Sequence, residues 1–416
     1  LPVRRADRSV DRGQPRLVYA VSAVGDAKRS NPPATLTETV ARDYHTVALV
    51  LQGGGALGAY QAGVYQALAE ADLQPTWLAG ISIGALNAAI IAGNPPERRV
   101  ERLREFWETI CRQPLLPAAL DFDTIAWPLL WQNGISGLAA WRALTEGQAG
   151  FFQPRLGPLL PWHTGPAGAS WYDTTPLRAT LERLADFDRI NDARAMRVSV
   201  GAVNVRTGDF TYFDNTRDTL RPEHFMASGA LPPGFPAVEI DGEFYWDGGM
   251  VSNTPLYKVL SDRPSHDTLV FQVDLWSARG SLPHDLAQVA ERSKEIQYSS
   301  RTRLITEFMR RTQEHRCLLY DVMALVPEDR RNDPAYRRAV ARSAAALTNV
   351  IHLIYRDKPY EGHYKDYEFS IASMQSHWRS GMEDMRHTLA HPQWLAAPDP
   401  EDPFVTHDVH RTTTSD

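Results

Sequence analysis

Residues 46–84, which read TVALVLQGGGALGAYQAGVYQALAEADLQPTWLAGISIG, decide the fold of this chain. Val47 to Leu51 is a continuous apolar run, which is typical of a strand that is buried on both faces of a mostly parallel sheet. Apolar residues then recur at helical spacing over 60–68, and Trp77 to Ile81 forms a second apolar run. The stretch therefore predicts a strand, a helix and a parallel strand.

The end of the second predicted strand carries GISIG, residues 80–84. Gly80 and Gly84 flank Ser82, and glycines allow the tight turn that pushes a serine hydroxyl out of the sheet. The following helix directs its positive end toward the turn. Ser82 is therefore a candidate nucleophile at the edge where open parallel sheets bind their ligands.

The first predicted strand is followed by GGGALG, residues 53–58, which has two interpretations. Glycines allow main-chain N–H groups to surround one oxygen, as an oxyanion hole requires, and the amide of Ile83 would add a donor. The pattern also fits the dinucleotide fingerprint GxGxxG, but that motif needs an acidic residue at the end of the second strand. Asp72 precedes that strand, so we favour the oxyanion hole.

The general base also has two interpretations, a histidine in a triad or an acid acting alone. None of the histidines after Ser82 lies in an obvious loop at a strand end. Asp247 follows an aromatic strand end and precedes Gly248 and Gly249, within a predicted hairpin that turns at Asp241 and Gly242. Asp247 is the candidate base, and its alternative is an ordinary Asp-Gly turn.

Composition limits the class of protein. The chain has 416 residues, 43% hydrophobic and 23% charged, with a net charge of −6, which indicates a globular protein and excludes a nucleic-acid partner. No apolar stretch reaches the roughly 18 residues of a transmembrane helix. The only cysteines, Cys111 and Cys317, lack metal-ligand spacing and favour a cytoplasmic location.

The organisation along the chain follows from changes in composition. Residues 112–172 hold five of the eleven tryptophans and form either a cap over the site or a packed insertion. The segment 292–316 is a basic amphipathic helix that contacts either a membrane surface or its own domain. The predicted parts are a flexible arm (1–43), a catalytic domain (44–278), a mainly helical domain (279–392) and a flexible tail (393–416).

GGGALG, GISIG and DGG at 247–249, in this order, resemble the three motifs of the patatin-like phospholipase family. The text around the acid, ASGALPPGFPAVEIDGEFYWDGGMVSNTPL (227–256), is similar to bacterial members. The resemblance covers about residues 46–276. Residues 281–392, with KDYEFSIASMQSHW, resemble the helical C-terminal domain of unknown function in one bacterial branch.

This resemblance implies a three-layer α/β/α sandwich and a dyad of Ser82 and Asp247 that hydrolyses lipid acyl esters without a cofactor or metal. The predicted oxyanion hole consists of Gly53, Gly54, Gly55 and Ile83. The glycines predicted to support the catalytic turns are Gly58, Gly80, Gly84, Gly248 and Gly249. The family often has a basic residue where this chain has Leu57.

Two other functions stay open, a transacylase with the same dyad and a catalytically silent lipid-binding or scaffold protein. Asn87 and Asn253 either orient the two catalytic turns or only satisfy local backbone groups. The sequence makes no prediction of the head group, the acyl-chain length or the oligomeric state.

Overall fold

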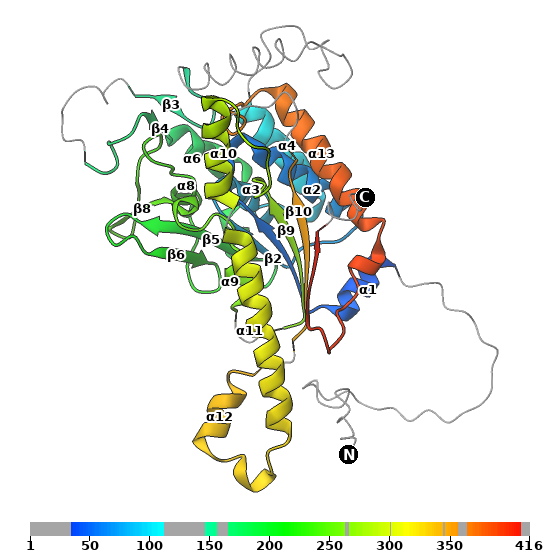
Figure 1. Cartoon of the computed structure of the whole chain (residues 1–416). Coiled ribbons are helices and arrows are strands. Elements are labelled where there is room, and N and C mark those ends of the chain that lie inside the picture. The colour runs from blue at the N-terminus through cyan, green and yellow to red at the C-terminus, as the bar shows by residue number, and fades with distance from the viewer. Residues whose placement is uncertain are drawn as a thin grey trace. The chain divides into compact units, whose positions relative to one another are not determined.

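The structure is a computed structural model that describes residues 35–111, 146–155, 165–262, 266–299, 301–343, 346–356 and 364–408. The chain divides into two compact units, Leu1–Thr35 and Leu36–Asp416. All described residues except Thr35 belong to the second unit (Figure 1). Most of the predicted arm and of the 112–172 insertion lies outside the described residues.

A nine-stranded sheet forms the centre of the described part, in the order β11-β10-β9-β1-β2-β5-β8-β7, with β6 also paired to β5. The parallel strands are β1 (Thr46–Leu51), β2 (Trp77–Gly80), β5 (Arg197–Asn204), β9 (Thr268–Asp274), β10 (Thr348–Ile354) and β11 (Phe404–Asp408). The strands antiparallel to their neighbours are β6 (Phe210–Asp214), β7 (Val238–Ile240) and β8 (Glu243–Asp247). This mostly parallel mixed sheet confirms the predicted α/β class.

Helices cover both faces of the sheet, which explains the uninterrupted apolar run of β1. Leu49 and Leu51 pack into the larger core cluster, to which α2 (Ala59–Glu70), α3 (Ile83–Ala92), α4 (Arg99–Ile110) and α13 (Ile371–Leu389) contribute. Ala48 and Val50 point the other way and pack with α9 (Leu256–Leu260) and α11 (Arg301–Ala324). Alternate strand residues thus enter two separate cores, as three layers require.

The pairing of the strands brings the predicted motifs to one edge. Leu51 pairs with Gly80, so the last residues of β1 and β2 lie side by side. Gly80 pairs with Val200, and Ala202, two residues further along β5, pairs with Asp247. The glycine motif, the serine turn and the acid therefore meet at the carboxyl edge of the parallel strands.

The hairpin that carries Asp247 is confirmed. Its strands β7 and β8 pair antiparallel and are joined at Asp241 and Gly242. Both residues have positive φ, 51° and 86°, which a two-residue turn of this kind requires.

The helical C-terminal region is confirmed in α10 (Leu286–Ser299), α11, α12 (Pro334–Val340) and α13. It also contains two strands that the sequence analysis did not predict. Residues 348–354 read TNVIHLI, and this run forms β10 because β9 leaves an open edge for a buried parallel partner. β11 then pairs with β10 inside the segment expected to be a flexible tail.

The remaining elements are short. α1 (Leu36–Asp43) lies within the predicted arm and buries Val40 in the core. α6 (Thr175–Leu184), α7 (Phe187–Ile190) and α8 (Pro222–Ser228) follow the insertion, and β3 (Gln153–Pro154) pairs with β4 (Tyr172–Asp173). None of the helices in the described ranges combines the length and the apolar character that crossing a membrane requires.

Candidate active site

Ser82 lies in the two-residue turn between β2 and α3. Its φ of 54° and ψ of −125° are a strained backbone conformation for a residue other than glycine. A Cβ atom on Gly80 would lie 2.5 Å from the Gly84 carbonyl oxygen, and one on Gly84 would clash with the carbonyl oxygen of Leu51. The turn therefore needs both flanking glycines.

The strained turn is held by Ser228, a residue that the sequence analysis missed. The Ser82 N–H donates to Ser228 Oγ at 2.9 Å, and the Ser228 hydroxyl donates to the Gly201 carbonyl at 2.7 Å. Ser228 is fully buried at the end of α8. It ties the turn to β5, and its only sequence signal was its place in ASGALPPG.

Asp247 ends β8 and is 2% exposed. Its Oδ1 accepts the Gly249 N–H at 2.7 Å, and Asp247 lines the same cavity as Ser82. Burial raises the pKa of Asp247 from its ordinary 3.8 to about 7, although the Ser82 side chain and the bond with the Gly249 N–H oppose this rise. A carboxylate of this pKa can exchange a proton near neutral pH.

The glycine loop after β1 presents main-chain donors. In the part of the chain that the structure describes, the N–H groups of Gly54, Gly55 and Ile83 have no acceptor. The Gly53 N–H differs, because it donates to the Asn253 carbonyl at 3.3 Å. Two of the three predicted glycines thus offer a donor, while Gly53 shapes the loop.

The Gly53 carbonyl is the anchor of this loop. It accepts the Asn253 side-chain amide and the Trp276 indole N–H, each at 2.9 Å. Asn87 holds the far end, because its amide donates to the Gly58 carbonyl at 3.0 Å. Both asparagines therefore bond to backbone carbonyls of the glycine loop or its helix, and their role in orienting the two catalytic turns stays a prediction.

The other supporting glycines lie where backbones approach closely. A Cβ on Gly58 would lie 2.5 Å from Ile83 Cγ1, and one on Gly248 would lie 2.7 Å from the Gly201 carbonyl oxygen. A Cβ on Gly249 would lie 2.8 Å from Asn253 Oδ1. These contacts pack the glycine loop against α3 and the acid turn against β5.

A cavity of about 280 Å³ joins the serine turn, the glycine loop and Asp247. None of the described residues that line it is a histidine. Nine of the residues that line it are aromatic: Phe151, Phe152, Trp171, Tyr172, Phe235, Trp276, Tyr298, Tyr367 and Phe369. The described end of the Trp-rich insertion thus lines the cavity, whereas Trp127, Trp131, Trp141 and Trp162 lie outside the described residues.

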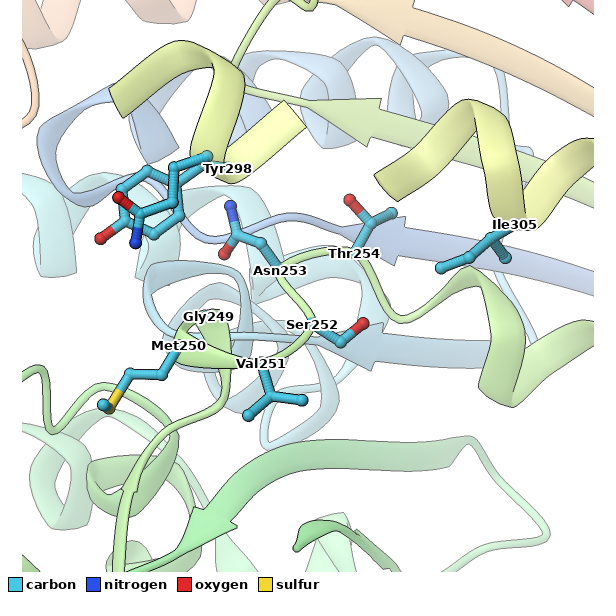
Figure 2. A pocket seen from close by; sticks show the side chains of 9 residues that line it. Gly249, Met250, Val251, Ser252, Asn253, Thr254, Tyr298 and Ile305 are labelled. Carbon is cyan, nitrogen blue, oxygen red and sulfur yellow. The ribbon is translucent and has the colours of Figure 1, made fainter. Parts of the chain in front are cut away.

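A smaller cavity of about 80 Å³ shares Gly249, Asn253 and Tyr298 with the larger one. Figure 2 shows Tyr298 of α10 and Ile305 of α11 over the loop that carries Met250 to Thr254. Burial and the nearby carboxylates of Asp247 and Asp366 raise the pKa of Tyr298 to about 12. Tyr298 therefore remains a neutral hydroxyl between the two cavities.

The C-terminal region also reaches the large cavity, which the sequence analysis did not predict. Asp366, Tyr367 and Phe369 line it, and Tyr298 does so from α10. Among the described residues, no group of three or more histidine, cysteine, aspartate or glutamate side chains is placed to hold a metal ion. The site therefore offers a serine, a buried carboxyl group, main-chain donors and an apolar cavity, which together suit acyl transfer.

Two family models match the chain. One, described as patatin-like phospholipase, matches residues 49–260, which is half of the chain and includes Ser82 and Asp247. The other, described as patatin phospholipase, matches residues 296–401.

Curated relatives match over short segments. A putative patatin-like phospholipase domain-containing protein of Caenorhabditis elegans is 36% identical over 84 residues, which is 20% of this chain and 7% of that protein. A patatin-like phospholipase domain-containing protein of Pyricularia oryzae is 32% identical over 103 residues, 22% of this chain and 13% of that protein. The chain thus matches only a small part of the length of these relatives.

Solved structures give distant matches. Human GIVD cytosolic phospholipase A2 matches with a TM-score of 0.39 and 12% identity, over 87% of this chain and 62% of that one. VipD from Legionella pneumophila matches with a TM-score of 0.30 and 16% identity, over 80% of this chain and 67% of that one. Both scores lie below 0.5 and add nothing to the fold described above.

Proposed function

Because the chain belongs to the patatin-like phospholipase family, we propose that it is a serine lipid acyl hydrolase with Ser82 as nucleophile and Asp247 as general base. The observation that carries this proposal is that Ser82 lines the same cavity as a buried carboxyl group whose pKa is about 7, and that the Ser82 side chain acts on this pKa. An ordinary aspartate is too weak a base for a serine hydroxyl, and burial removes part of that deficit.

Acylation begins when Ser82 Oγ attacks the ester carbonyl and its proton passes to Asp247. The carbonyl oxygen becomes an oxyanion that accepts the N–H groups of Gly54, Gly55 and Ile83. Each such donor typically lowers the barrier by about 3 kcal/mol. The intermediate then collapses, and the alcohol leaves with the proton that Asp247 returns, so that an ester of Ser82 remains.

Deacylation repeats these steps with water. Asp247 takes a proton from the water that attacks the acyl carbonyl, the same N–H groups stabilise the second oxyanion, and Ser82 Oγ leaves with the proton. The products are a carboxylic acid and the free serine. No further group is needed to balance the reaction.

The substrate we propose is a lipid acyl ester, since the aromatic and aliphatic side chains that line the cavity offer an apolar surface to an acyl chain. We also propose a cytoplasmic location with peripheral contact to lipid. Both cysteines, Cys111 and Cys317, are free and buried, which agrees with a reducing compartment.

Labelling with a fluorophosphonate probe tests the proposal, since the probe reacts only with an activated serine. The wild-type protein should be labelled and should hydrolyse p-nitrophenyl butyrate, and Ser82→Ala should do neither. Ser370→Ala is a suitable control, because it removes the N-cap of α13 and leaves the cavity intact. An unlabelled and inactive wild type would instead support a silent lipid-binding protein.

A further inference from the structure

The C-terminal region touches the oxyanion loop at its most constrained point. The Asp366 carbonyl oxygen accepts the Ala56 N–H at 2.9 Å. The same carbonyl lies so close to Gly55, whose φ is 55°, that a Cβ atom on Gly55 would clash with it. The backbone at Asp366 therefore determines where the loop at 54–56 can lie.

Asp366 is fixed in turn by an ion pair. Its carboxylate is buried at the cavity wall and accepts Lys294 Nζ of α10 at 2.7 and 2.8 Å. Burial raises the pKa of Asp366, and Lys294 opposes that shift. A buried carboxylate that loses its cation must take up a proton or move toward water, and either change releases its hold on the backbone.

A second ion pair, between Lys365 and α10, lies near Trp276, which bonds the other end of the loop. Lys365 Nζ bonds Glu295 at 2.9 Å and Glu291 at 3.2 Å, and it lies 5.5 Å from the ring centroid of Trp276. The Trp276 indole donates to the Gly53 carbonyl. The segment Lys365–Phe369 thus contacts the glycine loop directly at Gly55 and Ala56, and it reaches Gly53 through Trp276.

We propose that the Lys294–Asp366 ion pair positions the oxyanion loop, and that this is how the C-terminal region takes part in catalysis. Lys294 holds Asp366, the Asp366 carbonyl fixes Gly55 and Ala56, and the N–H groups at 54 and 55 stay directed at the reacting oxygen. The inference rests on the proposed hydrolase function. Lys294 and Asp366 are positioning residues, because they act through the loop and not on the substrate.

Lys294→Met and Asp366→Asn test this assignment, since the first removes the cation and the second keeps the shape of the carboxylate. Arg310→Met is the matched control, because it breaks the exposed ion pairs of Arg310 with Glu307 and Glu314 on α11. The readouts are kcat and KM for p-nitrophenyl butyrate, melting temperature, and hydrogen exchange of the peptide 52–58.

Both test variants should lower kcat by about tenfold to hundredfold and change KM by less than about twofold, because oxyanion stabilisation acts in the transition state. Exchange of peptide 52–58 should become faster in both and unchanged in Arg310→Met. Lys294→Arg should restore most of kcat. The double variant should have about the same kcat as either single variant, because both substitutions break the same ion pair.

Wild-type kcat together with wild-type exchange in the variants would overturn the inference while leaving the hydrolase intact. A raised KM at unchanged kcat would also overturn it, because that pattern belongs to a substrate-binding residue. An inactive and unlabelled wild type would mean that the hydrolase proposal fails. The exchange experiment would still decide whether the ion pair holds the loop.

Discussion

Ser82 and Asp247 face one cavity, and the Ser82 side chain lowers the pKa of the Asp247 carboxyl group, although the two residues come from the ends of two strands that do not pair with each other. β5 lies between those strands and fixes their separation. Both residues lie at the wall of the cavity, where burial makes the carboxylate more basic. The proposed transfer of the Ser82 proton to Asp247 depends on this arrangement.

The pH dependence of hydrolysis should follow the ionisation of Asp247. Its pKa of about 7 means that the carboxylate, the form that accepts the serine proton, is depleted at lower pH. We therefore expect kcat/KM to rise as the pH increases through about 7 and to reach a plateau above it. A profile measured with a neutral ester checks this, and a midpoint near the ordinary pKa of aspartate would contradict the account.

The same pKa predicts how stability depends on pH. The folded protein retains a proton on Asp247 up to about pH 7, whereas the unfolded chain releases it near 3.8. The free energy of unfolding therefore falls as the pH rises through this window. Above pH 7 the folded protein carries the full destabilisation that comes from ionising the buried Asp247. Asn cannot ionise, so Asp247→Asn should be the more stable protein at pH 8, by on the order of 2 to 4 kcal/mol.

Urea unfolding of wild type and Asp247→Asn at pH 8 and pH 3.5 measures this difference. The gap between the two proteins should shrink at pH 3.5, where both side chains are uncharged. If the difference in the free energy of unfolding did not depend on pH, ionisation of Asp247 would not destabilise the folded protein, and the account would be contradicted.

Ser228→Ala should uncouple the nucleophile turn from β5. The Ser82 N–H loses its acceptor, which costs about 1 to 3 kcal/mol of stability, and the serine moves off its position. We expect kcat to fall by about tenfold or more, since a small misplacement of a reacting group is costly. Ser370→Ala is the control for stability alone, because the loss of an N-cap costs about 1 kcal/mol. An equal loss of kcat in both variants would contradict a specific role for Ser228.

Leu231→Trp should shorten the preferred acyl chain. Leu231 lines the cavity on a loop, where a larger side chain can fill space without repacking the core. Hydrolysis of p-nitrophenyl esters of increasing chain length should shift toward short chains. Leu231→Met, which keeps the volume, should retain the wild-type profile, and an unchanged profile in the tryptophan variant would place the acyl chain elsewhere.

The local sequence pattern predicted the central strands and the turns that carry Ser82 and Asp247. The apolar run of β1, the glycines around Ser82 and the hairpin before Asp247 each constrain their own backbone, so neighbouring residues were enough to predict them. The contacts of Ser228 and Asp366 join residues that are distant in the sequence. No local pattern encodes such contacts, and sequence reasoning missed both.

The C-terminal strands show the same limit. The run 348–354 becomes a strand only because the free edge of β9 accepts it, and the charged helices around it favoured a helical interpretation of the whole region. The role of α10 at the active site was hidden for a related reason. Lys294 and Glu295 look like ordinary helix-surface charges until their partners Asp366 and Lys365 are known.

The most direct test of the central claim is the mass of the peptide that contains Ser82, measured after rapid acid quench of wild-type protein turning over p-nitrophenyl butyrate. The account predicts one butyryl group on Ser82 in the wild type, and none in Ser82→Ala or in Asp247→Asn at the same quench time. Turnover with no acyl group on Ser82, or with an acyl group on another residue, would contradict it.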